Sequence, residues 1–204
     1  MSNMTPSIKR KLDRAKIFLM DPEKGEVFFS SLLSFLNIKV DPGCGTAWTD
    51  GLNIGIDPEL IEKATDEELV GVFMHEMGHV VFDHIPIYVE NKSWMNRRLH
   101  NIAGDHYINL YIGDKGYVLP HWLDVYQDKK YKGWSTMQIY QDLDENEPDL
   151  PNGIGSDIRL PDNMSSTEYK ERVIGNIVKA TIQAERQNAY GSVPGSIQRV
   201  VKEV

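Results

Sequence analysis

Cysteine is nearly absent from this sequence, since Cys44 is the single one in 204 residues. No intramolecular disulfide can form, so the fold must be stabilised by a hydrophobic core, as is usual in a reducing compartment. Long hydrophobic runs are missing too, because Leu69 to Met74 falls far short of the roughly 18 residues that a membrane span needs. The basic N-terminus is followed by no apolar stretch. We therefore expect a cytoplasmic protein that is neither inserted in a membrane nor secreted.

An excess of positive charge is also lacking. Lysine and arginine together number 22, against 30 aspartate and glutamate residues, which gives a net charge of -8. This balance opposes non-specific attraction to nucleic acid or anionic lipid, so we expect neither as a partner. The remaining composition, 41% apolar and 25% charged, is that of an ordinary globular protein with a sizeable core.

The N-terminal part predicts helices followed by a small sheet. Apolar residues at helical spacing favour one helix from Thr5 to Asp21 and a second over 27–36. Short alternating segments then predict three strands, over 38–40, 46–49 and 52–56. Asp50 and Gly51 separate the last two, and this dipeptide favours a two-residue hairpin turn.

The middle of the chain predicts two long helices. Thr65 and Glu68 form a capping box that opens the first, which should end near residue 83. Its residues are apolar nearly all round, so we expect it to be central and buried. The second should span 94–112 and end at Gly113.

The C-terminal part predicts a long irregular segment between helices. Residues 144–165 combine proline, glycine and acids without periodicity, so we expect a long loop or lid there. A short helix over 135–143 should precede it, and a long helix over 166–189 should follow. We assign 1–190 to one domain. Residues 191–204 should form a loop and the start of a C-terminal helix that continues in a longer protein.

Two of the six histidines stand in the sequence HEMGH on the predicted central helix. His75 and His79 are about 40° and one turn apart on one helix face, so both imidazoles can reach one metal ion. Glu76 lies beside them and can reach a water bound to that ion. Burying two imidazoles and a carboxylate without partners would cost folding free energy. This cost favours a metal site over a purely structural role. Zinc is the expected ion, since it accepts imidazole and carboxylate ligands and leaves one position for water.

A third protein ligand is needed, and Asp105 is the best candidate. It shares a helix face with Ile102 and Asn109, so it places a carboxylate in a stripe that should face the core. Binding a metal would remove the cost of burying that charge. Asn109 can then bond to a ligand, and Gly104 should let this helix approach the central one closely.

Other histidines stay open as ligands. His84 is nine residues from His75, which is the opposite side of a continuous helix, and no glycine near residue 83 allows a break. We therefore expect His84 at the helix end or behind a ligand. If Asp105 only accepts a hydrogen bond from a ligand histidine, His100 and His106 become candidates.

Three segments resemble a known family. They are Thr49-Asp50-Gly51 with Ile54 and Asp57-Pro58, His75-Glu76-Met77-Gly78-His79 extended to His84, and Asn101-Ile102-Ala103-Gly104-Asp105 with Ile108-Asn109. They are similar to motifs of the "putative metallopeptidase" domain family, whose members are cytosolic. These domains are often followed by a von Willebrand factor A-like domain and are associated with MoxR-type AAA ATPases. The resemblance covers most of the chain.

The resemblance implies a mostly helical, zincin-like α+β fold, in which a small β-sheet packs over the active-site helix. A second helix would bring the third ligand. Carried over residue by residue, the resemblance implies His75, His79 and Asp105 as ligands of one Zn²⁺ ion and Glu76 as the catalytic base. It also implies an AAA ATPase or a von Willebrand factor A-like protein as partner.

We therefore predict a zinc metallopeptidase that hydrolyses a protein or peptide substrate, with Glu76 taking a proton from a zinc-bound water. An extended substrate would pair with strand 52–56 if that strand lies at a sheet edge. Candidate donors to the oxyanion are Tyr107, His106, His100 and His121. The alternative functions are a catalytically silent, zinc-stabilised interaction domain that docks a protein partner such as an AAA ATPase, and a hydrolase of non-peptide substrates.

Overall fold

In the computed structural model, which describes residues 4–21, 26–146, 158–159 and 164–201, three short strands form one sheet. They are β1 (Asn37–Val40), β2 (Ala47–Thr49) and β3 (Asn53–Ile56), in the order β1-β3-β2. β3 pairs antiparallel with β2, which confirms the predicted hairpin, and Gly51 turns the chain with φ of 85°. β3 also pairs in parallel with β1. β3 is therefore central, so the condition for substrate pairing with 52–56 is not met, and β2 lies at one edge of the three-stranded sheet.

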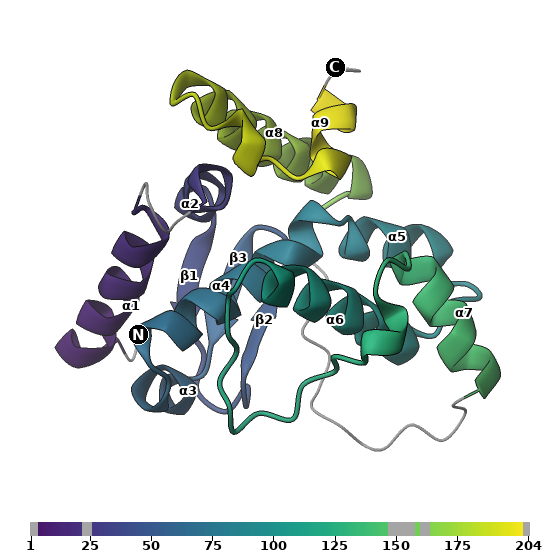
Figure 1. Ribbon diagram of the computed structural model, residues 1–204, viewed down its shortest axis with the longest axis horizontal. Coiled ribbons are helices and arrows are strands. Elements are labelled where there is room, and N and C mark those ends of the chain that lie inside the picture. Colours follow the sequence, from purple (N-terminus) through teal and green to yellow (C-terminus); the bar gives the residue numbers. More distant parts are fainter. Residues whose placement is uncertain (1–3, 22–25, 147–157, 160–163, 202–204) are drawn as a thin grey trace.

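Helices make up most of the described chain, which confirms the mostly helical α+β class (Figure 1). They are α1 (Pro6–Leu19), α2 (Val27–Ser34), α3 (Pro58–Lys63), α4 (Asp66–Val81), α5 (His84–Asn91), α6 (Arg97–Asp114), α7 (Thr136–Asn146), α8 (Ser166–Arg186) and α9 (Gly195–Val201), with 3-10 turns η1 (Lys129–Tyr131) and η2 (Tyr190–Ser192). Among the described residues, none of these helices combines the length and the apolarity that crossing a bilayer requires.

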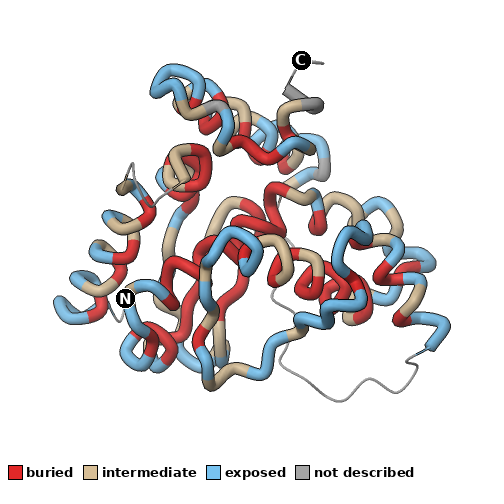
Figure 2. Tube along the Cα trace, viewed as in Figure 1, coloured by how far each residue is buried: buried red, intermediate tan, exposed pale blue. Residues whose placement is uncertain are grey.

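α4 lies at the centre of the molecule. Thr65 accepts from the Glu68 N–H, and the Glu68 carboxylate accepts from the Thr65 N–H, so the predicted capping box is present. Every residue from Glu68 to Val81 is buried, as the red tube in Figure 2 shows. α1, α2, α6 and β2 all pack against this helix. The sequence therefore correctly predicts a helix that is covered on all sides.

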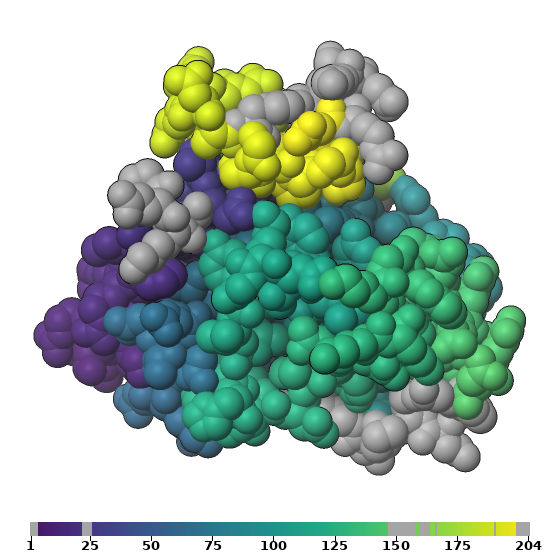
Figure 3. Space-filling model, in the orientation of Figure 1, coloured from purple at the N-terminus to yellow at the C-terminus, as the bar shows by residue number. Residues whose placement is uncertain are grey.

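The other helices form layers around this centre. α7 packs on α6, and α2 packs on α8. α8 and α9, drawn yellow-green and yellow, lie together above the rest in Figures 1 and 3. Most of the predicted loop over 144–165 falls on residues outside those described. Its described residues Ile158 and Arg159 lie beside β2, where Ile158 forms a parallel bridge with Thr49.

The chain turns sharply after α4, which the sequence did not predict. Asp83 adopts the left-handed conformation with φ of 58°, and the new helix α5 starts at His84. Aspartate tolerates this region better than most residues, so the break needs no glycine. Pro86 falls in the first turn of α5, where its missing N–H is harmless. The predicted end of the helix near residue 83 is confirmed, and His84 lies behind His79, but the expectation that a break here needs a glycine is wrong.

α4 and α6 approach closely at a glycine, though not at the predicted one. A Cβ atom on Gly78 would lie 2.8 Å from Cγ2 of Ile108, which is fully buried. Gly104 faces the His84 ring instead, where a Cβ would lie 2.7 Å from Nδ1. α6 starts at Arg97, after the cap Asn96, and continues past Gly113.

Gly78→Ala should push α6 away from α4, because the buried Ile108 side chain has no room to move. We expect a loss of about 1–3 kcal/mol of unfolding free energy, measured by denaturant unfolding. Gly175→Ala on α8 is the control, because its Cβ would meet nothing within 4 Å. That change should be neutral or stabilise by up to about 1 kcal/mol. Equal effects of the two substitutions would contradict the close approach at Gly78.

Candidate active site

Two helices bring together the residues singled out by the sequence. α4 carries His75 and His79, one turn apart, and α6 carries Asp105. The two Nε2 atoms are 3.2 Å apart, and Asp105 Oδ1 lies 3.6 Å from Nε2 of His75 and 3.3 Å from Nε2 of His79. All three residues are buried, and among the described residues they form a group that can hold a metal ion.

The spacing of these atoms fits a small divalent cation. Ligand atoms about 2.0–2.1 Å from a tetrahedral zinc ion are roughly 3.3–3.4 Å from one another. The observed separations of 3.2, 3.3 and 3.6 Å bracket that value. Three protein ligands would leave the fourth tetrahedral position open, as in catalytic rather than structural zinc sites.

Asn109 fixes the orientation of His75. Its Nδ2 donates to the carbonyl of Tyr126 at 2.9 Å, so its Oδ1 must be the atom that lies 2.7 Å from Nδ1 of His75. His75 therefore carries its proton on Nδ1 and directs the Nε2 lone pair at the cluster. The sequence predicted this role for Asn109, and the contact confirms that it bonds to the imidazole of His75.

Asn101 holds the third member of the cluster. Its Nδ2 donates to Asp105 Oδ2 at 3.0 Å, whereas Oδ1 has no hydrogen-bond donor in the described part of the chain. Burial raises the pKa of Asp105 to about 6, against the opposing influence of His75 and the Asn101 bond. A buried carboxylate oxygen that faces two imidazole nitrogens is the arrangement that a bound cation would stabilise.

His75, His79 and Asp105 are here called the metal-binding group. Three further histidines, His84, His100 and His106, lie outside it. His84 is buried and its Nδ1 lies 3.1 Å from Nδ1 of His79. Burial, followed by the neighbouring histidines, lowers its pKa well below the ordinary value. His100 donates from Nε2 to the His84 carbonyl at 2.8 Å, and His106 accepts from the Asp128 N–H at 3.0 Å. These three are thus poor substitutes for Asp105 as a ligand.

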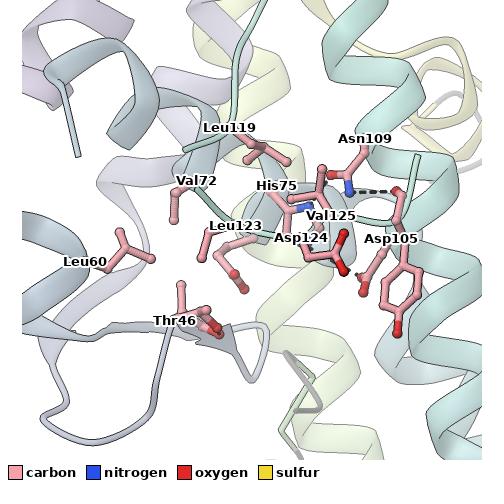
Figure 4. Close-up of a pocket in the computed structure, with 13 residues that line it drawn as sticks. Thr46, Leu60, Val72, His75, Asp105, Asn109, Leu119, Leu123, Asp124 and Val125 are labelled. Atoms are coloured by element: carbon pink, nitrogen blue, oxygen red, sulfur yellow. Dashed lines mark hydrogen bonds and ion pairs between the residues drawn. The ribbon is translucent and has the colours of Figure 1, made fainter. Parts of the chain in front are cut away.

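A cavity of about 70 Å³ opens beside the cluster (Figure 4). His75, Glu76 and Asp105 line one side, and Glu76 is only 2% exposed. The other lining residues are the aliphatic Leu60, Val72, Leu119 and Leu123, then Thr46 and Ala47 beside the edge strand, and finally Asn109, Asp124, Val125 and Tyr126. None of the predicted oxyanion donors lines it.

Those predicted donors are occupied elsewhere. Tyr107 packs edge-on against Phe82 with ring centroids 4.8 Å apart, and His121 bonds through Nδ1 to Glu68 at 3.0 Å. Sequence reasoning missed Tyr126 and Asp124 because they lie in an irregular segment. The only signal there was its richness in aromatic residues.

Residues 117–128, here called the covering segment, cross the cavity and are held at both ends. At one end the Val118 carbonyl lies against Gly71, where a Cβ would approach it to 1.9 Å. The backbone N–H and the ring Nδ1 of His121 both bond to the Glu68 carboxylate. Burial alone would raise the pKa of Glu68, but its hydrogen bonds outweigh that effect and lower the pKa to about 2. At the other end Gln127 donates to the Asn109 carbonyl at 2.8 Å. The covering segment is therefore fixed in place as one wall of the cavity beside the metal-binding group.

The sequence matches the family described as "Putative metallopeptidase domain" over residues 7–204. The chain belongs to this putative metallopeptidase family. Searches of the curated proteins and of the solved structures returned no match. Membership of the putative metallopeptidase family indicates a hydrolase that uses a metal and acts on peptides, and the group of His75, His79 and Asp105 is a possible place for that metal.

Asp105→Asn should have opposite effects with and without metal. In metal-free protein the pKa of Asp105 is raised, so its contribution to stability is present below about pH 4 and is lost as the pH rises through about 6. The substitution should therefore stabilise metal-free protein at pH 8 by on the order of 2–3 kcal/mol and have little effect at pH 4. It should also abolish the rise in melting temperature that zinc gives to the wild type.

Denaturant unfolding in chelator at both pH values, with thermal unfolding in zinc, checks this. Asn101→Ala, which keeps the Asp105 carboxylate but removes the donor to its Oδ2 and the acceptor of the Ile158 N–H, is the control. A variant that zinc still stabilises as strongly as the wild type would count against Asp105 as a ligand.

Proposed function

We propose that this protein is a zinc-dependent peptidase, in which His75, His79 and Asp105 hold the ion and Glu76 is the general base. One observation carries the proposal: three electron-pair donors converge at tetrahedral spacing, and Glu76 lines the same cavity. Membership of a family described as metallopeptidases supports it. A cytoplasmic location and an AAA ATPase or von Willebrand factor A-like partner stay predictions from the sequence.

Glu76 supplies the proton transfers of the reaction. A zinc ion in this site would polarise the scissile carbonyl and make a water at its open position more acidic. The Glu76 carboxylate would take a proton from the attacking water as the water oxygen bonds to the carbonyl carbon. It then delivers a proton to the amide nitrogen as the C–N bond breaks, and the second product leaves as an amine. The buried position of Glu76 strengthens both transfers, because little bulk water competes for the proton.

Tyr126 is our candidate for stabilising the oxyanion. Thr46 and Tyr126 are the two lining residues with a hydroxyl group, and Tyr126 belongs to the segment that passes over the metal-binding group. A phenol O–H can donate to the carbonyl oxygen as negative charge develops there. This role replaces those predicted for Tyr107 and the three histidines.

The edge strand β2 is suited to hold an extended peptide at Ala47, since its outer edge at Thr49 is already paired with Ile158 and Arg159. Asp57 N–H donates to the Thr46 carbonyl, so Thr46 bonds toward β3 and the backbone N–H and C=O of Ala47 point the other way. Both residues line the cavity. A substrate strand can pair with Ala47 and place an apolar side chain against Leu60, Val72 and Leu123.

Glu76→Gln should keep zinc binding and lose peptide cleavage. The amide has the same shape as the carboxylate but cannot accept a proton, so kcat should fall by at least about 10²–10⁴-fold. Zinc content by elemental mass spectrometry and cleavage of a peptide library measure the two properties. Cleavage by the variant at the wild-type rate would refute the peptidase. No cleavage by zinc-loaded wild type, together with partner binding unaffected by the substitution, would favour the interaction domain instead.

Tyr126→Phe should lower kcat by about 10²-fold or more while leaving KM and zinc affinity nearly unchanged, because the lost hydrogen bond forms only in the transition state. Steady-state kinetics on a cleaved peptide measures this. Tyr117→Phe, a change in the same segment outside the cavity, is the control. A drop in zinc affinity for Tyr126→Phe would show that the ring supports the metal-binding group instead.

A further inference from the structure

A buried histidine lies directly behind one member of the metal-binding group. His84 is fully buried and contacts His79 on one side and Thr136 on the other, with Nδ1 3.1 Å from His79 Nδ1 and Nε2 3.0 Å from the Thr136 hydroxyl. The mechanism proposed above does not use it. The surrounding chain is nevertheless built to hold it in this place.

Three features accommodate the His84 ring. The left-handed conformation of Asp83 turns the chain so that His84 points inward rather than continuing α4. Gly104 on α6 leaves the space that the ring fills. His100 donates from Nε2 to the His84 carbonyl and so fixes its backbone. Asp83 keeps an unfavourable backbone conformation, and Gly104 leaves matching space for the His84 ring. A strained position of this kind indicates that the side chain it orients, His84, has a role.

The two contacts of His84 have only two consistent proton arrangements when both imidazoles are neutral and each carries one N–H, as metal binding requires of His79 and as burial favours for His84. In the first, His79 donates from Nδ1 to His84 Nδ1, and His84 donates from Nε2 to Thr136. In the second, Thr136 donates to His84 Nε2, and His84 donates from Nδ1 to His79. Only the first leaves His79 Nε2 without a proton and able to bind a cation.

We propose that His84 is a positioning residue that accepts the Nδ1 proton of His79 and so fixes His79 in the metal-binding tautomer. Histidine ligands usually donate their second N–H to a carbonyl or carboxylate. Here a neutral imidazole takes that place, which holds the tautomer without adding a second negative charge behind the site. The inference rests on the metal site of the proposed function but does not require that the protein cleave peptides.

The direct test needs no substitution. Long-range ¹H–¹⁵N correlation spectra of zinc-loaded, ¹⁵N-labelled protein report which nitrogen of each histidine is protonated. We expect the proton on Nε2 of His84 and on Nδ1 of His79. A His84 protonated on Nδ1 in protein that binds zinc would overturn this inference alone. Wild-type protein that binds no zinc would overturn the proposed function and this inference together.

A matched pair of variants tests the energetic consequence. Asparagine and leucine have the same branched shape, but only the asparagine side chain of His84→Asn would place an acceptor oxygen where the histidine has Nδ1, bonded to the same carbon. We expect His84→Leu to bind zinc about 10–100-fold more weakly than wild type in chelator competition, and His84→Asn to recover most of that loss. Both variants lose the Thr136 contact equally, and metal-free unfolding measures that shared cost. Equal zinc affinity of the two variants would refute the role of the acceptor.

Discussion

The structure depends on holding three electron-pair donors face to face in a dry interior. The Nε2 atoms of His75 and His79 and the Oδ1 atom of Asp105 lie within 4.8 Å of one another, and all three residues are buried. Without a cation the charged form of Asp105 is unfavourable here, since burial raises its pKa to about 6. A fold can keep such groups together only if its packing prevents them from moving apart. The burial of α4 from Glu68 to Val81 and the close approach at Gly78 supply that restraint.

Each member of the group is oriented by a different side chain behind it. Asn109 accepts from His75, Asn101 donates to Asp105, and His84 lies against His79. Two of these supports come from α6 and the third from the start of α5. The turn at Asp83 therefore belongs to the site as much as the helices do. Because α6 carries both Asp105 and the Asn109 side chain that orients His75, the position of this one helix sets two of the three members.

The sequence predicted the parts of the site that depend on helical geometry. The spacing of His75 and His79 fixes their relative angle, and the stripe of Ile102, Asp105 and Asn109 likewise depends only on the helix repeat. The hydrophobic pattern also predicted the buried central helix correctly. Such features are local, so no knowledge of the rest of the fold is needed to read them.

What the sequence missed depends on contacts between distant residues. The αL conformation of Asp83 is possible for many aspartates, and here the space beside Gly104 and the bond from His100 select it. The central position of β3 depends on a parallel pairing with β1, which no pattern within β3 reveals. Tyr126 reaches the cavity because irregular backbone is anchored at Asn109.

The covering segment forms one wall of the cavity, through Leu119 and the run from Leu123 to Tyr126. Asn109 links this wall to the metal-binding group. Its Nδ2 bonds to the Tyr126 carbonyl, whereas its Oδ1 separately accepts from His75. Gln127 and Asp128 add bonds to the Asn109 carbonyl and to His106, so this end of the segment is tied to α6 by three hydrogen bonds. The helix that presents Asp105 and orients His75 therefore also positions the wall of the cavity that carries Tyr126.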